Sequence, residues 1–283
     1  WEDMCDVKLP MPSITRQKEI VNQYKMLQDR IKLNNSLIQK IEETAQAIYK
    51  QWFVDFEFPD ENGKPYKSNG GEMEFNNSLD KEIPKGWEVR PLKSVCTKIG
   101  SGSTPRGGKD SYHTEGISLI RSQNVHDFIF MPEDIAFIDD IQAKKLQNVI
   151  VQENDILLNI TGVSVARCCK VPEFILPARV NQHVMIIRPD NSYYLSHYLL
   201  CLLCHSDNKS KLIGISQSGS TREAITKSEI ENFQILVPPK EIAKKFDEKL
   251  YVLLRMLENK TLQNQKLLRL KNLLLSRLAI LED

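Results

Sequence analysis

The sequence predicts an α+β protein in which one mixed α/β domain lies between two long α-helices. Two observations predict this fold. Residues 13–56 and 240–281 each carry an unbroken helical pattern that contains neither Gly nor Pro. The residues between them alternate short β-like runs with turn residues such as Gly, Pro and Asn. The two helices therefore bracket one globular segment.

Residues 1–12 precede the first helix and end in Leu9-Pro10-Met11-Pro12. This stretch resembles residues 229–238, which end in Leu236-Val237-Pro238 and close the central domain. Because the two stretches share one plan, we expect residues 1–12 to be the last strand of an upstream domain whose body is missing.

The first helix is expected over residues 13–58, and its apolar side chains repeat every 3.5 residues. This period predicts a coiled-coil seam. One heptad position holds Tyr24, Ile31, Ile38, Ala45 and Trp52, and the other holds Ile20, Leu27, Asn34, Ile41 and Ile48.

The second helix, expected over residues 239–283, has a less regular seam. Its positions include Leu250, Leu253, Leu257, Lys260, Asn264, Leu267, Lys271 and Leu274. A helix with one apolar stripe needs a partner, so we predict that the two helices pack as an antiparallel coiled coil. Asn34 and Asn264 lie near the middle of their seams, and we expect them to face each other and fix the register. The alternative is that each amide is solvated where the helices splay.

The segment between the helices divides in two. Residues 59–82 are rich in Gly, Pro, Asn and acidic side chains and predict a linker. Residues 83–238 predict the mixed domain, with strands at 117–120, 155–158 and 184–187 and a helix at 193–204.

Composition limits the class of protein. No apolar run approaches the ~20 residues of a membrane span, and the first residues do not form a signal peptide. The six cysteines show no disulfide-framework spacing, so we expect a cytoplasmic protein. The net charge of +1 argues against a generally basic, non-specific nucleic-acid binder.

Two candidate chemical sites do not fit the motif that they resemble. Gly100–Lys109 lacks the glycine spacing of a phosphate-binding loop, and Asp110 stands where such a loop needs Ser or Thr. Cys201, Cys204 and His205 have metal-like spacing without a second ligand pair, so no metal is predicted. No nucleophile motif or dinucleotide fingerprint is present, so no catalytic residue is predicted.

Polar clusters at the ends of predicted strands contain side chains of the kinds that read base edges or touch a DNA backbone. Ordinary turn chemistry and a solvated basic surface are the alternative explanations. The candidates are Arg106, Lys109, Tyr112, Arg121, Gln123, Asn124, Asn159, Thr161, Arg167, Arg179, Asn181, Gln182, His183, Ser218, Ser220, Thr221 and Arg222.

The order of several short motifs resembles the specificity subunit of type I restriction-modification systems, over nearly the whole chain. Each motif is weak alone, but their order is specific. They are Trp52–Phe56, Ile83–Val89, Gly102–Pro105 with Tyr112, Asp155–Leu158 through Asn181–His183, and Gly219–Thr221 leading to Ile235–Pro239.

The resemblance implies that residues 83–238 form a target recognition domain that reads one half of a split sequence in double-stranded DNA. It implies that the two helices are spacers that dock methyltransferase subunits, and through them the restriction subunit. The subunit itself would be non-catalytic, with S-adenosylmethionine, ATP and Mg²⁺ in its partners. The chain would be the C-terminal half of such a subunit or a half-length form, and pairing of two copies stays open. The runner-up reading is a coiled-coil scaffold or protein-binding adaptor.

Overall fold

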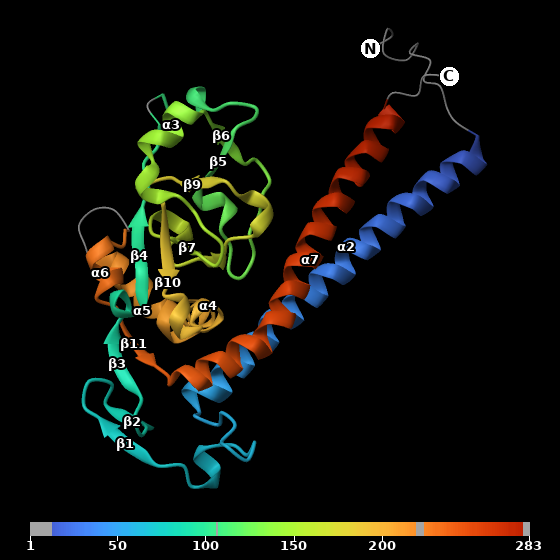
Figure 1. Cartoon of the computed structure of the whole chain (residues 1–283). Coiled ribbons are helices and arrows are strands. Elements are labelled where there is room, and N and C mark those ends of the chain that lie inside the picture. Colours follow the sequence, from blue (N-terminus) through green and yellow to red (C-terminus); the bar gives the residue numbers. More distant parts are fainter. Residues whose placement is uncertain (1–12, 106, 219–223, 280–283) are drawn as a thin grey trace. The chain divides into compact units, whose positions relative to one another are not determined.

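In this computed structural model, residues 13–105, 107–218 and 224–279 are described (Figure 1). They form two compact units: residues up to Ile41 together with those from Arg255, and Glu42–Leu254. The long helices α2 (Ile14–Tyr49) and α7 (Lys240–Ala279) both run through this division. The predicted α+β fold with two long helices is confirmed, whereas the strand expected over residues 1–12 lies outside the described residues.

The first unit consists of the early part of α2 and the late part of α7. Asn34 Nδ2 donates to Asn264 Oδ1 at 2.9 Å, and the Lys271 ammonium lies 5.8 Å from the centre of the Tyr24 ring. Residue numbers rise along one helix as they fall along the other, so the helices are antiparallel. The amides of Asn34 and Asn264 face each other, as their seam positions indicate.

Burial follows the predicted seam of α2 closely. Ile20, Asn34, Ile38 and Ile41 are buried, and Leu27 is half-buried. On α7, Thr261 is buried where the heptad pattern places Lys260, which is half-exposed. Thr261 is short enough to fit the seam without burying an ammonium, whose desolvation would be costly.

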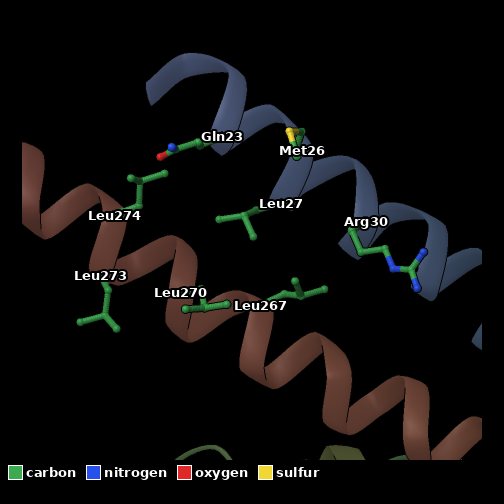
Figure 2. A pocket seen from close by; sticks show the side chains of 8 residues that line it. All are labelled: Gln23, Met26, Leu27, Arg30, Leu267, Leu270, Leu273 and Leu274. Carbon is green, nitrogen blue, oxygen red and sulfur yellow. The ribbon is translucent and has the colours of Figure 1, made fainter. Parts of the chain in front are cut away.

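Around Leu27 the seam is open. Side chains of both helices border a space of about 480 Å³, shown in Figure 2. Leu267 and Leu274 of α7 face Leu27 across it, and both are half-buried. Dispersion contacts are therefore incomplete in this part of the pair.

In the second unit, the buried stripe of α2 shifts by one residue. Ile48 was expected on the seam but is half-buried, while its neighbour Tyr49 is buried. A 3.6-residue helix drifts away from a 3.5-residue pattern, and a π-helical turn at Lys50–Val54 follows directly. Leu253 on α7 is half-buried in this unit.

Phe53, which follows α2, is the centre of an aromatic cluster that joins the end of α2 and the start of α7 to the domain. Its ring centroid lies 4.6 Å from that of Tyr198, 4.8 Å from that of Phe246 and 5.8 Å from that of Trp87. Phe53 belongs to the π-helical turn that follows α2, and the other rings come from helix α4 (Ser196–Cys204), α7 and the start of the domain. All four rings are buried. Aromatic packing of this kind stabilises the junction within the unit.

The domain core contains a four-stranded antiparallel sheet in the order β4-β10-β7-β8 (Figure 1). Its strands are Cys96–Ser101, Val184–Pro189, Ile156–Asn159 and Cys168–Lys170. A second sheet has the order β6-β5-β9, formed by Ala136–Ile138, Ile117–Ile120 and Ala178–Val180, with β5 and β9 parallel. Apolar side chains of both sheets share one buried cluster.

Short elements complete the unit. Strand β11 (Gln234–Val237) pairs with β3 (Glu88–Pro91), and helices α3 (Asp140–Lys145), α4 (Ser196–Cys204), α5 (Ser206–Ser218) and α6 (Lys227–Glu231) surround the sheets. The segment 59–82, expected to be a linker, contains strand β1 (Met73–Asn76), which forms a hairpin with β2 (Lys81–Pro84). Phe58 stacks on both Tyr66 and Trp87, so this segment has packing partners that its composition did not indicate.

Candidate nucleic-acid interface

Three loops meet at the end of the four-stranded sheet where β4 and β7 finish and β10 begins. The register places Met185 opposite Ser101 and Val184 opposite Asn159. Backbone hydrogen bonds tie the loops together, because Gly102 N donates to Asn181 O at 3.1 Å and Ile160 N donates to His183 O at 3.0 Å. The strand pairing therefore brings residues 101–105, 160–164 and 181–183 to one site.

A chain of hydrogen-bonded side chains, here called the polar chain, crosses the three loops. It consists of Thr104, Gln182, His183 and Thr161. The Thr104 hydroxyl donates to Gln182 Oε1. Gln182 Nε2 lies 3.0 Å from His183 Nε2, and His183 Nδ1 lies 2.6 Å from Thr161 Oγ1. Gln182 is exposed and the other three are half-buried, so the chain borders solvent.

The direction of the hydrogen bonds follows from their chemistry. Gln182 Nε2 can only donate, so the facing His183 Nε2 accepts in the neutral imidazole. The ring proton then lies on Nδ1 and is donated to Thr161 Oγ1. The Thr161 hydroxyl hydrogen remains available to an outside acceptor. The polar chain thus offers directional hydrogen-bonding groups of the kind that distinguish base edges.

Gly102 permits the close approach on which this site depends. A Cβ at this position would overlap the backbone oxygen of Val180 and crowd Val149. Glycine is therefore required here for packing. Packing therefore explains one of the glycines in segment 100–108, the segment that resembles a phosphate-binding loop.

Four predicted candidates are turned inward. Asn124 bonds Arg121 N, Met131 O and Glu133 O, and Asn181 accepts from His183 N. Asn159 Nδ2 donates to Ser122 O and Ser164 Oγ, and Arg179 donates to Ala143 O and Ala178 O. All four side chains are buried, and burial lowers the pKa of Arg179. Burial and these internal hydrogen bonds do not favour the predicted contacts of the four side chains with DNA, which stay predictions. Asn159 Oδ1 is buried without a hydrogen-bond partner.

Other candidates remain at the surface. Gln123 and Ser218 are exposed, and Arg167 is half-buried. The Arg121 guanidinium donates to Asp134 O and lies 5.5 Å from the centre of the Tyr112 ring, so both side chains are held by the domain.

Several candidates cannot be placed. Arg106, Ser220, Thr221 and Arg222 lie outside the described residues, and the side chain of Lys109 is also not described.

Arg188, one of the basic residues at 167, 170, 179 and 188, has its charge balanced by a carboxylate. Arg188 forms two hydrogen bonds with the buried Asp155 carboxylate, at 2.7 and 2.8 Å. Burial raises the pKa of Asp155, although the hydrogen bonds from Arg188 act in the opposite direction. The Arg188–Asp155 pair therefore anchors the start of β7 and does not add a free cation to the surface.

Within residues 13–105, 107–218 and 224–279, no group of three or more His, Cys, Asp or Glu side chains could hold a metal ion. Across the same residues, no helix combines the length and the apolar character of a membrane span.

Residues 84–270 match a family model described as the type I restriction modification DNA specificity domain. The chain belongs to this family. The match covers the domain that carries the polar chain and most of α7.

Curated relatives and a solved structure agree with the specificity-domain family. The chain is 29% identical over 276 residues to the type I restriction enzyme MjaIX specificity subunit of Methanocaldococcus jannaschii, covering 97% of this chain and 60% of that protein. It is 21% identical over 324 residues to the HindI specificity subunit of Haemophilus influenzae, covering 98% and 69%. The fold matches the type I restriction-modification S subunit from M. genitalium with a TM-score of 0.61 at 14% identity, covering 94% of this chain and 61% of that one.

Sequence reasoning missed two residues of the site. Thr104 begins the polar chain, and Val163, between Thr161 and Ser164, is fully exposed. The position of Thr104 directly before Pro105 was a signal for a restricted backbone at this residue. For Val163 the signal was an apolar residue inside an otherwise polar turn.

Proposed function

We propose that this chain is a DNA-recognition subunit of a type I restriction-modification enzyme and reads one half of a bipartite target. The observation that supports this most directly is the polar chain. Four hydrogen-bonding side chains from three loops are held in fixed geometry at the border with solvent, in a domain of the specificity family. Direct readout of double-stranded DNA requires such pre-positioned donors and acceptors.

The helix pair is the proposed docking site for methyltransferase subunits. Met26, Leu33 and Leu37 on α2 are exposed, and their spacing of seven and four residues places them on one side of the helix. Helical partners bury stripes of this kind. Through the methyltransferase subunits, the restriction subunit would join the complex.

We place catalysis in the partner subunits. In the proposed complex, S-adenosylmethionine, ATP and Mg²⁺ would be bound by them. This chain would supply position and sequence choice, and its own residues would bind and orient DNA.

The test is DNA binding and methylation by the full chain assembled with the methyltransferase subunits of its own system. Sequence-specific binding that weakens steeply with salt supports the proposal, because phosphate contacts release counterions. Gln182→Ala removes the centre of the polar chain and should weaken specific binding by about 10-fold, with non-specific binding unchanged.

A matched control is available in Gln152→Ala. Gln152 is an exposed glutamine that precedes β7, at the opposite end of that strand from the polar chain. It should bind DNA as the wild type does. Arg222→Ala, at a DNA-binding candidate of the sequence that lies outside the described residues, should impair methylation.

Shortening both helices by one heptad tests their role as spacers. Seven residues span about 10.5 Å of helix, or roughly three base pairs. The gap between half-sites should shorten while the bases read stay the same. A complex that assembles but shows no sequence preference would instead indicate a scaffold or protein-binding adaptor.

A further inference from the structure

Val163 is an apolar side chain with no protein contact to cover it. It lies in the loop between β7 and β8, and its exposed fraction is 100%. Among the large hydrophobic side chains of the described residues it is the most exposed, followed by Ile141 at 70%. Single exposed apolar residues are common on protein surfaces. Exposure alone therefore does not assign a role to Val163, whereas the conformation and surroundings of its loop do.

The loop is fixed by its own hydrogen bonds. Asn159 Nδ2 donates to Ser164 Oγ at 3.2 Å, and Ala166 N donates to Asn159 O at 2.9 Å. Ala166 is fully buried at a φ of 65°, a backbone conformation that costs energy for a residue with a Cβ. Surrounding contacts must therefore hold this turn in place, and Val163 is presented on a firm support.

The surroundings of Val163 are those of the proposed DNA interface. Thr161, two residues earlier, ends the polar chain and pairs with Ala224 in an isolated β-bridge. Arg167, four residues later, is half-buried and carries a positive charge. An aliphatic group beside directional hydrogen-bonding groups matches the major groove, where the thymine C5-methyl is the apolar feature of the base edges.

We propose that Val163 contacts the C5-methyl group of a thymine in the half-site read by this domain, an inference that rests on the proposed function. The size of the side chain favours this contact over insertion between base pairs. Wedges that unstack DNA are usually larger, such as Phe, Leu or Met. Val163 thereby selects an A·T pair at one position and adds an apolar contact to the hydrogen bonds of its neighbours.

The experiment uses the full chain with its methyltransferase subunits and a target site mapped from methylated genomic DNA. Each thymine of the half-site is replaced singly by uracil, which removes only the methyl group. One replacement should weaken binding to the wild-type complex by about 4-fold. The Val163→Ala complex should bind the thymine duplex about 4-fold more weakly than the wild type and no longer distinguish uracil at that position.

Ile141→Ala is the control. Ile141, on α3, is 70% exposed and lies outside both the polar chain and the helix pair, so its complex should keep the full preference for thymine. Because the side chain of Val163 is fully exposed, its replacement should leave folding intact, which circular dichroism checks.

Three outcomes overturn the inference. If the wild-type complex binds all sequences equally, the proposed function fails and the inference fails with it. If binding is sequence-specific but no uracil duplex binds more weakly, only the inference fails. If Val163→Ala weakens binding while keeping the discrimination against uracil, Val163 contacts the backbone or a base step, and the thymine contact is wrong.

Discussion

Glu42 on α2 is predicted to destabilise the folded protein when it ionises. Burial, followed by repulsion from Asp127 and Glu43, raises its pKa from 4.5 to about 7. The folded state therefore holds a proton on Glu42 over a pH range in which the unfolded chain has lost it. Stability falls as pH rises from 4.5 to about 7, and the loss is complete above pH 7.

The size of the effect follows from this pKa difference. It corresponds to about 3.4 kcal/mol for a fully buried group. Glu42 is only half-buried, and solvent screening reduces the figure to about 1–2 kcal/mol. Glu42→Gln removes the charge, so the variant should be more stable than the wild type by about 1–2 kcal/mol at pH 8 and nearly equal to it at pH 4.

Urea unfolding at pH 4 and pH 8, followed by circular dichroism, measures this difference. Glu248→Gln, at an exposed position of α7, controls for the loss of one negative charge. An equal stability difference between wild type and Glu42→Gln at both pH values would refute the reasoning, as would destabilisation by Glu42→Gln at pH 8.

Three further predictions concern stability. Gly102→Ala should lower the free energy of unfolding, measured in urea, by about 3 kcal/mol, because its Cβ would overlap a backbone oxygen of β9. Gly100→Ala is the control: its Cβ would lie 3.7 Å from the nearest side-chain atom, so the loss should be less than about 1 kcal/mol. Asn34→Leu should raise the midpoint of thermal unfolding, because it replaces a fully buried amide by an apolar group. Light scattering should show mixed oligomeric states of this variant. A large loss of stability would contradict the prediction. Asp155→Ala should destabilise the folded domain by about 3 kcal/mol, because it leaves the Arg188 guanidinium without its carboxylate partner. An unchanged unfolding midpoint would show that this ion pair does not stabilise the domain.

The helices could be predicted because their pattern is local and long. Ile20, Asn34 and Ile41 follow a period that allows few alternatives to a paired helix. The shift from Ile48 to Tyr49 could not be predicted, since it depends on the adjoining π-helical turn and on aromatic rings distant in sequence.

The candidate site was predicted less well than the fold. The sequence located the loops, because polar clusters stand next to apolar strands. It could not show that Asn124 and Arg179 turn inward, since the carbonyl groups that accept their hydrogen bonds lie on other segments of the chain. Thr104 and Gln182 are 78 residues apart, and only the pairing of β4 with β10 brings their loops together.

The cluster around Phe53 limits how recognition domains can be exchanged between relatives. A transplant with boundaries at residues 83 and 238 would replace Trp87 and Tyr198 and leave their partners Phe53 and Phe246 behind. The side chains of the transplanted domain would then not pack against Phe53 and Phe246. A working chimera therefore needs either compatible aromatic side chains at positions 87 and 198 or cut points that keep all four rings together in one parent chain.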